Sequence, residues 1–341
     1  MKNLCLVLCC CAFVQLGFGQ SDSLNIYLKL GEDAFSRGQN LPAYQYYKKA
    51  VGFDAKNLEA ARGLANTARE LKYAAIARES YKKVLELKPN DTSAITQLVQ
   101  LNFATRQWPG AIEMAKRSIA LGIGVKNEWV IAKSYYEMEE YGSCLEYIEK
   151  AWRKDSSQAE LPFIAARSYV EMSNYRKAAG CYEQALRLSP DNETWMYEAA
   201  MTYSAIPDEA KAIPWFEKAV LKGYPRTKDV VENMAVSYMG IKAYDKCLTL
   251  VNEVLASKPE DLELLYLSGE ASYRMGKTDD AINRWDKMLS IDKNQARALY
   301  MIGIAYIKKG DDNKGETLCD KAIAMDPSLA RLKTQRSQFG L

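Results

Sequence analysis

The chain has 341 residues, of which 46 are Lys or Arg and 43 are Asp or Glu, so its formal net charge at pH 7 is only +3. It contains no histidine, which excludes Ser–His and Cys–His catalytic pairs, histidine proton shuttles and histidine metal sites. The balanced charge also argues against nucleic acid or an anionic membrane as the main partner, because both require a concentrated basic face.

The first 19 residues predict a cleaved bacterial secretory signal. Lys2 precedes an apolar run that ends in Gly17-Phe18-Gly19, a small-x-small pattern that export peptidases accept. The run is too short to cross a bilayer of roughly 30 Å as a permanent anchor. A lipid anchor is the less favoured alternative, since none of the cysteines at positions 9 to 11 follows a Gly, Ala or Ser. We therefore expect an exported protein, periplasmic or associated with the cell envelope, with no membrane span after signal cleavage.

From Leu24 to Leu329 the chain repeats itself about every 34 residues, the period typical of a two-helix solenoid unit. Prolines such as Pro89, Pro190 and Pro259 end many of the units, because a residue with no amide hydrogen disfavours further helix. A series of small residues marks where the second predicted helix of each unit crosses the first. These crossing residues are Ala43, Ala77, Ala111, Cys144, Ala178, Ala212, Cys247, Ala281 and Gly315.

The repeat predicts about nine tandem helix–turn–helix units in one solenoid, residues 20–329. One helical hairpin cannot bury both of its apolar faces, so stacked units must share a continuous core. A polar tail, residues 330–341, follows and is expected to cap the last apolar face. The units are expected at residues 24–57, 58–91, 92–124, 125–158, 159–192, 193–227, 228–261, 262–295 and 296–329.

The units resemble the tetratricopeptide repeat family, whose pattern is a Leu-Gly pair, a Tyr, a Gly, an Ala, an aromatic residue, an Ala and a Pro. The resemblance covers almost all of the chain after the signal, and it implies an all-α, right-handed superhelix. It also implies a scaffold that is not an enzyme and that binds a peptide or helix segment in a concave groove. The paired position holds Leu30-Gly31, Ser268-Gly269 and Ile302-Gly303, and the tyrosine position holds Tyr135, Tyr169, Tyr203, Tyr238 and Tyr306.

In this family the first helix of each unit lines the groove, so groove residues are implied by their place in the repeat. The rows of matching positions include acidic residues such as Glu232 and Glu270, but they are richest in aromatics. Aromatic side chains offer a large rigid face to a peptide, although at helical spacing they also pack in cores. The candidate groove residues are Arg62, Asn66 and Arg69 as a modest anion-holding patch, Trp129, Lys133, Tyr136, Phe163 and Arg167 as the strongest cluster, and Phe103, Tyr197, Tyr266, Tyr273 and Tyr300.

The four cysteines after the signal follow the spacing of the repeat and not that of a metal site. We expect buried thiols, with Cys144 and Cys181 as the pair to test for a disulfide. The chain has no Cys-x-x-Cys pair and no Gly-rich phosphate loop after a predicted strand. No catalytic residue, no cofactor-binding residue and no metal ligand is therefore predicted.

The expected partner is a protein or peptide segment that belongs to an envelope assembly or secretion component. Two alternatives stay open. One is a glycan, because Tyr and Trp faces stack on sugar rings and several envelope proteins with similar repeats handle carbohydrates. The other is a purely architectural role, in which the convex side or the ends of the solenoid pair with further copies to form a homo-oligomer.

Overall fold

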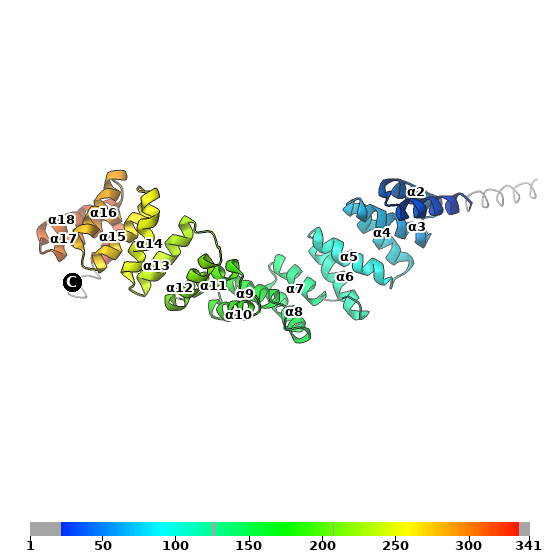
Figure 1. Ribbon diagram of the computed structural model, residues 1–341, viewed down its shortest axis with the longest axis horizontal. Coiled ribbons are helices and arrows are strands. Elements are labelled where there is room, and N and C mark those ends of the chain that lie inside the picture. Colours follow the sequence, from blue (N-terminus) through cyan, green and yellow to red (C-terminus); the bar gives the residue numbers. More distant parts are fainter. Residues whose placement is uncertain (1–21, 125–126, 207, 334–341) are drawn as a thin grey trace, which may run out of the picture. The chain divides into compact units, whose positions relative to one another are not determined.

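The computed structural model describes residues 22–124, 127–206 and 208–333, and every regular element in these ranges is helical (Figure 1). The predicted signal, residues 1–19, and the end of the predicted tail, residues 334–341, lie outside them. Within the described residues no helix has both the length and the apolar character needed to cross a membrane.

First and second helices alternate along the chain. After a first helix at residues 22–36, the second helices are α2 (Asn40–Phe53), α4 (Ala74–Leu87), α6 (Trp108–Ala120), α8 (Tyr141–Lys154), α10 (Tyr175–Leu188), α12 (Glu209–Leu221), α14 (Tyr244–Ser257), α16 (Thr278–Ile291) and α18 (Asp312–Met325). The first helices between them are α3 (Leu58–Glu70), α5 (Thr92–Ala104), α7 (Asn127–Glu137), α9 (Glu160–Glu171), α11 (Glu193–Ala205), α13 (Lys228–Gly240), α15 (Leu262–Arg274) and α17 (Ala296–Lys308).

Adjacent helices pack in pairs, and most first helices contact the second helix before them as well as the one after them. The predicted all-α solenoid of two-helix units is therefore confirmed for the described residues. Contacts divide the chain into two units, Met1–Ser168 and Tyr169–Leu341, which we call unit 1 and unit 2. The boundary falls inside α9 and not in a linker.

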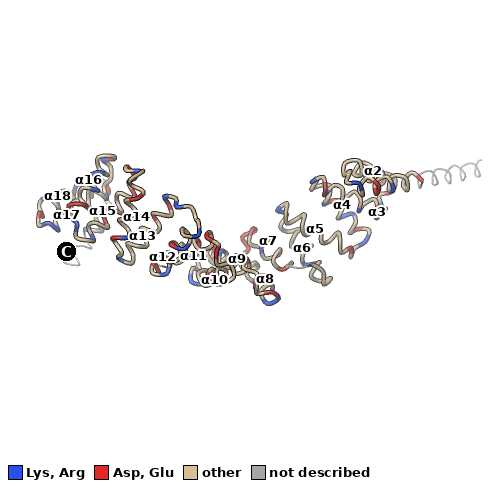
Figure 2. Tube along the Cα trace, in the orientation of Figure 1, with Lys and Arg blue, Asp and Glu red and all other residues tan. Residues whose placement is uncertain are grey.

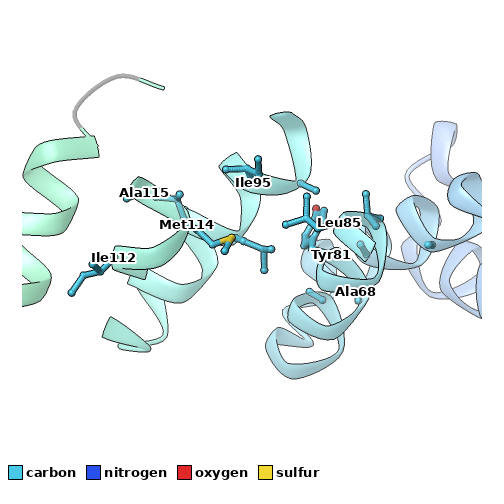
Figure 3. Close-up of a cluster of buried hydrophobic side chains, with 14 of the residues drawn as sticks. Ala68, Tyr81, Leu85, Ile95, Ile112, Met114 and Ala115 are labelled. Atoms are coloured by element: carbon cyan, nitrogen blue, oxygen red, sulfur yellow. The ribbon is translucent and has the colours of Figure 1, made fainter. Parts of the chain in front are cut away.

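The predicted crossing residues lie where the two helices of a pair meet. All of them are buried, and the alanines and both cysteines have no exposed surface at all. Gly315 shows why the position must be small, since a Cβ there would lie 2.6 Å from the carbonyl oxygen of Gly303 on the facing helix. Larger apolar side chains fill the space around the crossings. In unit 1 they form a buried cluster that extends from α2 to α7 and includes Tyr81, Leu85, Ile95 and Met114 (Figure 3).

Most of the short turns inside the pairs share one backbone geometry. At the end of α13, Lys242 has a φ of 62°, its amide donates to the Met239 carbonyl, and the Ala243 amide donates to the Tyr238 carbonyl. This is a Schellman C-cap, which needs a left-handed residue at this position. Gly276 takes the place of Lys242 in the turn between α15 and α16, with a φ of 80°.

The chain after α18 packs back on that helix. Pro327–Leu329 form a 3-10 turn in which Leu329 is buried, and Leu332 contacts the same apolar cluster. The Lys333 Nζ lies 2.7 Å from an Asp320 oxygen and 3.1 Å from a Glu316 oxygen of α18. The described part of the predicted tail therefore covers the side of the last helix. Acidic and basic residues are interspersed along all the helix pairs (Figure 2).

Candidate functional site

The strongest predicted cluster comes together in unit 1 on the first helices α5, α7 and α9. The rings of Phe103 and Trp129 lie 5.3 Å apart between centroids. The Arg167 guanidinium lies 5.6 Å from the Tyr136 ring centroid and 5.8 Å from that of Phe163, so it joins α7 to α9. We call these residues, together with Lys133, the aromatic–cation cluster.

The members of the aromatic–cation cluster are half-buried, so each keeps part of its surface available. The Lys133 Nζ lies 4.7 Å from the Tyr136 ring centroid and 2.6 Å from a Glu137 oxygen. Glu137 neutralises part of the positive charge, but the exposed ring edges and the two cations share one face of adjacent helices. Such a surface offers apolar contact, cation–π contact and hydrogen-bond donors to a ligand.

The predicted anion-holding patch is already occupied by groups of the same chain. Arg62 forms an ion pair with the buried Asp91, which is the N-cap of α5 and accepts from the Ala94 amide at 3.0 Å. Asn66 accepts a hydrogen bond from the Tyr81 hydroxyl at 2.8 Å, and Arg69 donates to a Gln97 oxygen at 2.5 Å. Arg62 and Arg69 therefore join α3 to α5 of the next unit, and Asn66 joins α3 to α4 within its own unit. These are structural roles that the repeat pattern did not reveal.

Within this patch, the Asp91 carboxylate is held by a hydrogen bond and an ion pair. Burial alone would raise the pKa of the Asp91 carboxyl, but the Ala94 amide and the Arg62 guanidinium outweigh burial and lower that pKa. The carboxylate therefore stays charged at neutral pH and holds Arg62 against α5. A free anion would have to compete with an internal carboxylate for the same guanidinium.

The candidate tyrosines of unit 2 lie in three different settings. Tyr197 of α11 stacks on Tyr224 with ring centroids 4.4 Å apart, and its hydroxyl accepts from the Asn233 amide at 3.1 Å. Tyr273 is half-buried, with the Lys308 Nζ 4.2 Å from its ring centroid. Tyr266 and Tyr300 are core residues, only 8% and 3% exposed, so they offer little surface to a ligand, although Tyr266 lines a hollow in unit 2.

The same face of unit 2 contains a hollow of about 760 Å³ that the aromatic pattern did not single out. Its walls come from the first helices α13, α15 and α17, and they include Glu232, Val236, Glu270 and Arg297. Val236 is 53% exposed, although it is apolar. The Arg297 guanidinium lies 4.2 Å from the ring centroid of Tyr266. Glu232 and Glu270 already stood in the rows of groove positions, but only the structure places them around one hollow with Arg297.

The cysteines of the described residues are all free thiols, including Cys144 and Cys181. Cys144 is fully buried and lies 3.5 Å from the Ser168 hydroxyl. Burial raises the pKa of both thiols, and burial followed by the Glu270 charge raises the pKa of Cys247 to about 11. These thiols therefore remain protonated and unreactive at neutral pH. The described residues also contain no group of three or more Cys, Asp or Glu side chains that could hold a metal ion.

Stacked helix pairs, small crossing residues and a first-helix face with aromatic side chains define an α-helical repeat protein. Comparison with family models goes one step further. Models of the tetratricopeptide repeat match residues 63–91, 165–226 and 296–329, and a model of subunit 3 of the anaphase-promoting complex, or cyclosome, matches residues 104–185. The chain is a tetratricopeptide-repeat protein, and such proteins are typically scaffolds for protein–protein interaction and not enzymes.

Solved structures with similar folds include repeat proteins. YrrB, described as a protein with an unusual peptide-binding site, is 22% identical over 55% of this chain and 97% of its own, with a TM-score of 0.45. PilW, a type IV pilus biogenesis factor, is 19% identical over 60% of this chain and 94% of its own, with a TM-score of 0.44.

The C-terminal part of a repeat protein from Cytophaga hutchinsonii is 14% identical over 81% of this chain and 99% of its own, with a TM-score of 0.47. At these levels of similarity the structures carry no argument about a ligand. Among curated proteins, no sequence matches the chain significantly.

Proposed function

We propose that this protein is an exported scaffold that captures a peptide or helix segment of an envelope or secretion component on its first-helix face. The observation that carries the proposal is the aromatic–cation cluster of α5, α7 and α9. Trp129 and Lys133 are one helical turn apart on α7, and Phe163 and Arg167 are one turn apart on α9, so the same pair of residue types occurs on two adjacent first helices.

The cluster favours a segment with both apolar and acidic side chains. Half-buried rings can bury apolar groups with little loss of conformational entropy, because Trp, Tyr and Phe have few rotatable bonds. The Arg167 guanidinium is held over two rings and can donate further hydrogen bonds to a carboxylate. Peptide segments commonly bind helical surfaces through a few such anchors.

Export is the second part of the proposal, and it rests on the first 19 residues. Expression of the full chain in a Gram-negative host, followed by cell fractionation and intact-mass measurement, tests it directly. We expect the envelope fraction to contain a chain that begins at Gln20. A cytosolic chain that keeps Met1 would contradict export without affecting the proposal for the cluster.

Binding by the cluster can be tested with the double variant Trp129→Ala, Phe163→Ala. The purified protein and the variant are each crosslinked to an envelope extract, and the captured proteins are identified by mass spectrometry. Because both rings are half-buried, their loss is expected to remove capture of the partner while the helical content measured by circular dichroism stays unchanged. The affinity for the captured partner should fall at least about tenfold, as is usual when central aromatic anchors are truncated.

Trp215→Ala is a matched control. Trp215 is also half-buried, and the Lys218 Nζ lies 4.6 Å from its ring centroid. Trp215 lies on the second helix α12, away from the first-helix face. We expect this variant to capture the partner as well as the unchanged protein does. Equal capture by the double variant would contradict binding at the cluster. Capture of glycans alone, or of further copies of this chain alone, would replace the proposed partner by one of the two alternatives.

A further inference from the structure

The second-helix side of unit 1 contains a hollow between α4 and α6 that the proposed function does not use. It has a volume of about 500 Å³, within the usual range for sites that bind small groups. Leu85, Leu98 and Met114 form its apolar part, and all three belong to the core of unit 1, where Figure 3 labels Leu85 and Met114. We call it the Asn102 hollow, after the polar residue at its base.

A comparison between repeats explains why the space is open. In five of the nine units the tyrosine position, nine residues before the crossing residue, holds a tyrosine, and several of these rings reach the second helices on both sides. Tyr238, for example, donates to a Glu217 oxygen of α12 at 2.7 Å, and the Lys246 Nζ of α14 lies 5.5 Å from its ring centroid. In the third unit this position holds Asn102, and no ring fills the space between α4 and α6.

The two partners of that tyrosine are also replaced around Asn102. Lys82 stands where Glu217 stands, and Gly110 stands where Lys246 stands, each counted from its crossing residue. Both Lys82 and Gly110 line the hollow. Around Tyr238 the three positions hold an acid, a hydroxyl and a cation. Around Asn102 the same positions hold a cation, an amide and a glycine, which has no side chain. In the next unit, Lys116 at the position of Lys82 donates to the Tyr135 hydroxyl at 3.0 Å. A lysine at this position can therefore reach an oxygen at the centre of such a space.

Asn102 is aimed into the hollow by its neighbours. It is only 4% exposed, and its Oδ1 accepts from the Arg78 Nε at 2.9 Å. Because a guanidinium can only donate, this bond fixes the amide orientation and turns the Nδ2 donor away from Arg78. The Nδ2 atom lies 2.9 Å from the place where a Cβ of Gly110 would stand, and no described group accepts a hydrogen bond from it. A donor that faces the hollow and has no acceptor in the protein can bind a ligand that carries an acceptor.

The charged residues around the hollow favour an acceptor that is an anion. Arg78, Lys82 and Arg117 line it with three positive charges, against the two negative charges of Glu86 and Glu113. The Lys82 Nζ also lies 2.9 Å from an oxygen of the exposed Glu79, but a surface ion pair of this kind contributes little stability, so a ligand carboxylate can replace Glu79 there. An apolar floor beside an amide donor and cations favours an apolar side chain next to a carboxylate. One residue supplies both groups when it is an apolar residue at the C-terminus of a protein.

We infer that the Asn102 hollow binds the C-terminal residue of a partner protein, with an apolar side chain on Leu85, Leu98 and Met114 and the terminal carboxylate at Asn102 Nδ2 and Lys82. This hollow lies between the second helices α4 and α6, with Leu98 and Asn102 of α5 also lining it, and none of its lining residues belongs to the aromatic–cation cluster. The inference therefore goes beyond the proposed function, and neither depends on the other.

Two fluorescein-labelled peptides of sequence GSAAL, one with a free C-terminal carboxylate and one with a C-terminal amide, test the inference by fluorescence anisotropy. The purified protein should bind the carboxylate form at least about tenfold more tightly than the amide form, the effect expected from one charge-assisted hydrogen bond. Equal binding of the two forms, or no binding of either at about 1 mM protein, would overturn the inference.

Asn102→Asp is the sharpest variant, because it keeps an oxygen for Arg78 and replaces only the Nδ2 donor by an acceptor. It should weaken binding of the carboxylate peptide at least about tenfold through repulsion of like charges. Asn252→Asp is the matched control, since Asn252 also accepts from an arginine, Arg284 at 3.0 Å, and the substitution changes the net charge equally. Wild-type affinity in Asn102→Asp, or an equal loss in Asn252→Asp, would contradict the proposed site.

Asn102→Tyr gives an independent test, because it fills the hollow with the residue that most other units use at this position. The variant should bind neither peptide while its melting temperature stays close to that of the unchanged protein. Trp129→Ala, Phe163→Ala should bind the carboxylate peptide normally. Loss of peptide binding in that double variant would show that the peptide occupies the first-helix face, and it would overturn the assignment to the Asn102 hollow.

Discussion

At the residue scale, small side chains decide how closely the helices of a pair approach. Gly269 on α15 faces the fully buried Trp285 on α16, and a Cβ at Gly269 would lie 2.3 Å from the Trp285 Nε1. Gly63 has the same relation to Tyr47, with 2.2 Å between its added Cβ and the Tyr47 Cε1. In both cases a glycine on a first helix makes room for a ring on a second helix, so the two positions must vary together.

Gly269→Ala should therefore destabilise the protein, although alanine is the better helix former. We expect the free energy of unfolding to fall by about 2 kcal/mol, the usual cost of overpacking a core. Urea unfolding followed by circular dichroism measures the change. Gly180→Ala is the matched control, because Gly180 lies inside α10 with nothing within 4 Å of its added Cβ. That variant should gain about 0.5 to 1 kcal/mol, and a loss of stability there would show that crowding is not the cause.

Buried tyrosines give the stability of the fold an alkaline limit. Burial, followed by the nearby Glu270 charge, raises the pKa of Tyr266 from 10.0 to about 12. Burial and a hydrogen bond to a glutamate also raise the pKa values of Tyr203 and Tyr238. Because the folded state holds these protons more tightly than the unfolded chain, their contribution is complete below pH 10 and is lost as the pH rises through the raised values.

We expect the free energy of unfolding to decline above pH 10, with tyrosinate absorbance at 295 nm rising in parallel. Tyr266→Phe removes one of the responsible groups, so the decline between pH 10 and 12 should become smaller by about 2 kcal/mol. Urea unfolding of both proteins at a series of pH values measures the difference. An identical decline in the variant would contradict a role for Tyr266.

At the element scale, the turn inside each pair constrains the chain more tightly than the helices do. The left-handed position of this turn holds glycine at Gly38, Gly276 and Gly310, but it holds a residue with a side chain in several other turns. These non-glycine residues are Lys72, Arg106, Glu139, Ser173 and Lys242, with φ values between 55° and 62°. A side chain in this conformation costs about 1 to 2 kcal/mol, which the surrounding hydrogen bonds and packing must offset.

Lys242→Gly should relieve this strain and stabilise the protein by about 0.5 to 1 kcal/mol, less than the full strain because glycine also gains freedom in the unfolded chain. Thermal and urea unfolding both report the change. Lys258→Gly is the control, since Lys258 is an exposed lysine at the end of α14 with a φ of −129°. Its substitution should cost stability. Equal effects of the two substitutions would show that the left-handed φ is not strained.

At the scale of the whole molecule, each helix pair is stabilised by its contacts with the neighbouring pairs. Buried clusters join neighbouring helices, such as α2 to α7 in unit 1 and α15 to α17 in unit 2. In such a solenoid the free energy of folding is close to a sum of terms for each repeat and each interface between neighbours. Damage to one pair should therefore spread to its neighbours and fade with distance along the chain.

Gly269→Ala tests this at the level of the whole chain. By hydrogen–deuterium exchange with mass spectrometry, we expect faster exchange in α15 and α16, a smaller increase in α14 and α17, and no change in α2 to α4. Gly180→Ala should produce no such gradient. A uniform increase over all peptides would instead indicate that the chain unfolds as a single cooperative unit.

The sequence by itself determined the two-helix unit, its period, the buried crossing residues and the exclusion of histidine chemistry. These features depend on the spacing of residues within one hairpin, and that spacing recurs in every unit. The same spacing also placed Trp129, Lys133, Phe163 and Arg167 on adjacent first helices, and the structure brings Arg167 into contact with the rings.

Only the tertiary structure decided which residues of a row remain available. Tyr266 and Tyr300 are predicted groove residues like Trp129, but neighbouring helices bury them, and Arg62 is held by an aspartate 29 residues later in the chain. The Asn102 hollow likewise depends on Lys82, Asn102 and Gly110, which lie on or beside three different helices. Exposure, ion pairing and open space depend on how side chains from different units meet. The period of the sequence predicts which helix a residue lies on, but not the side-chain volumes and orientations that determine these contacts.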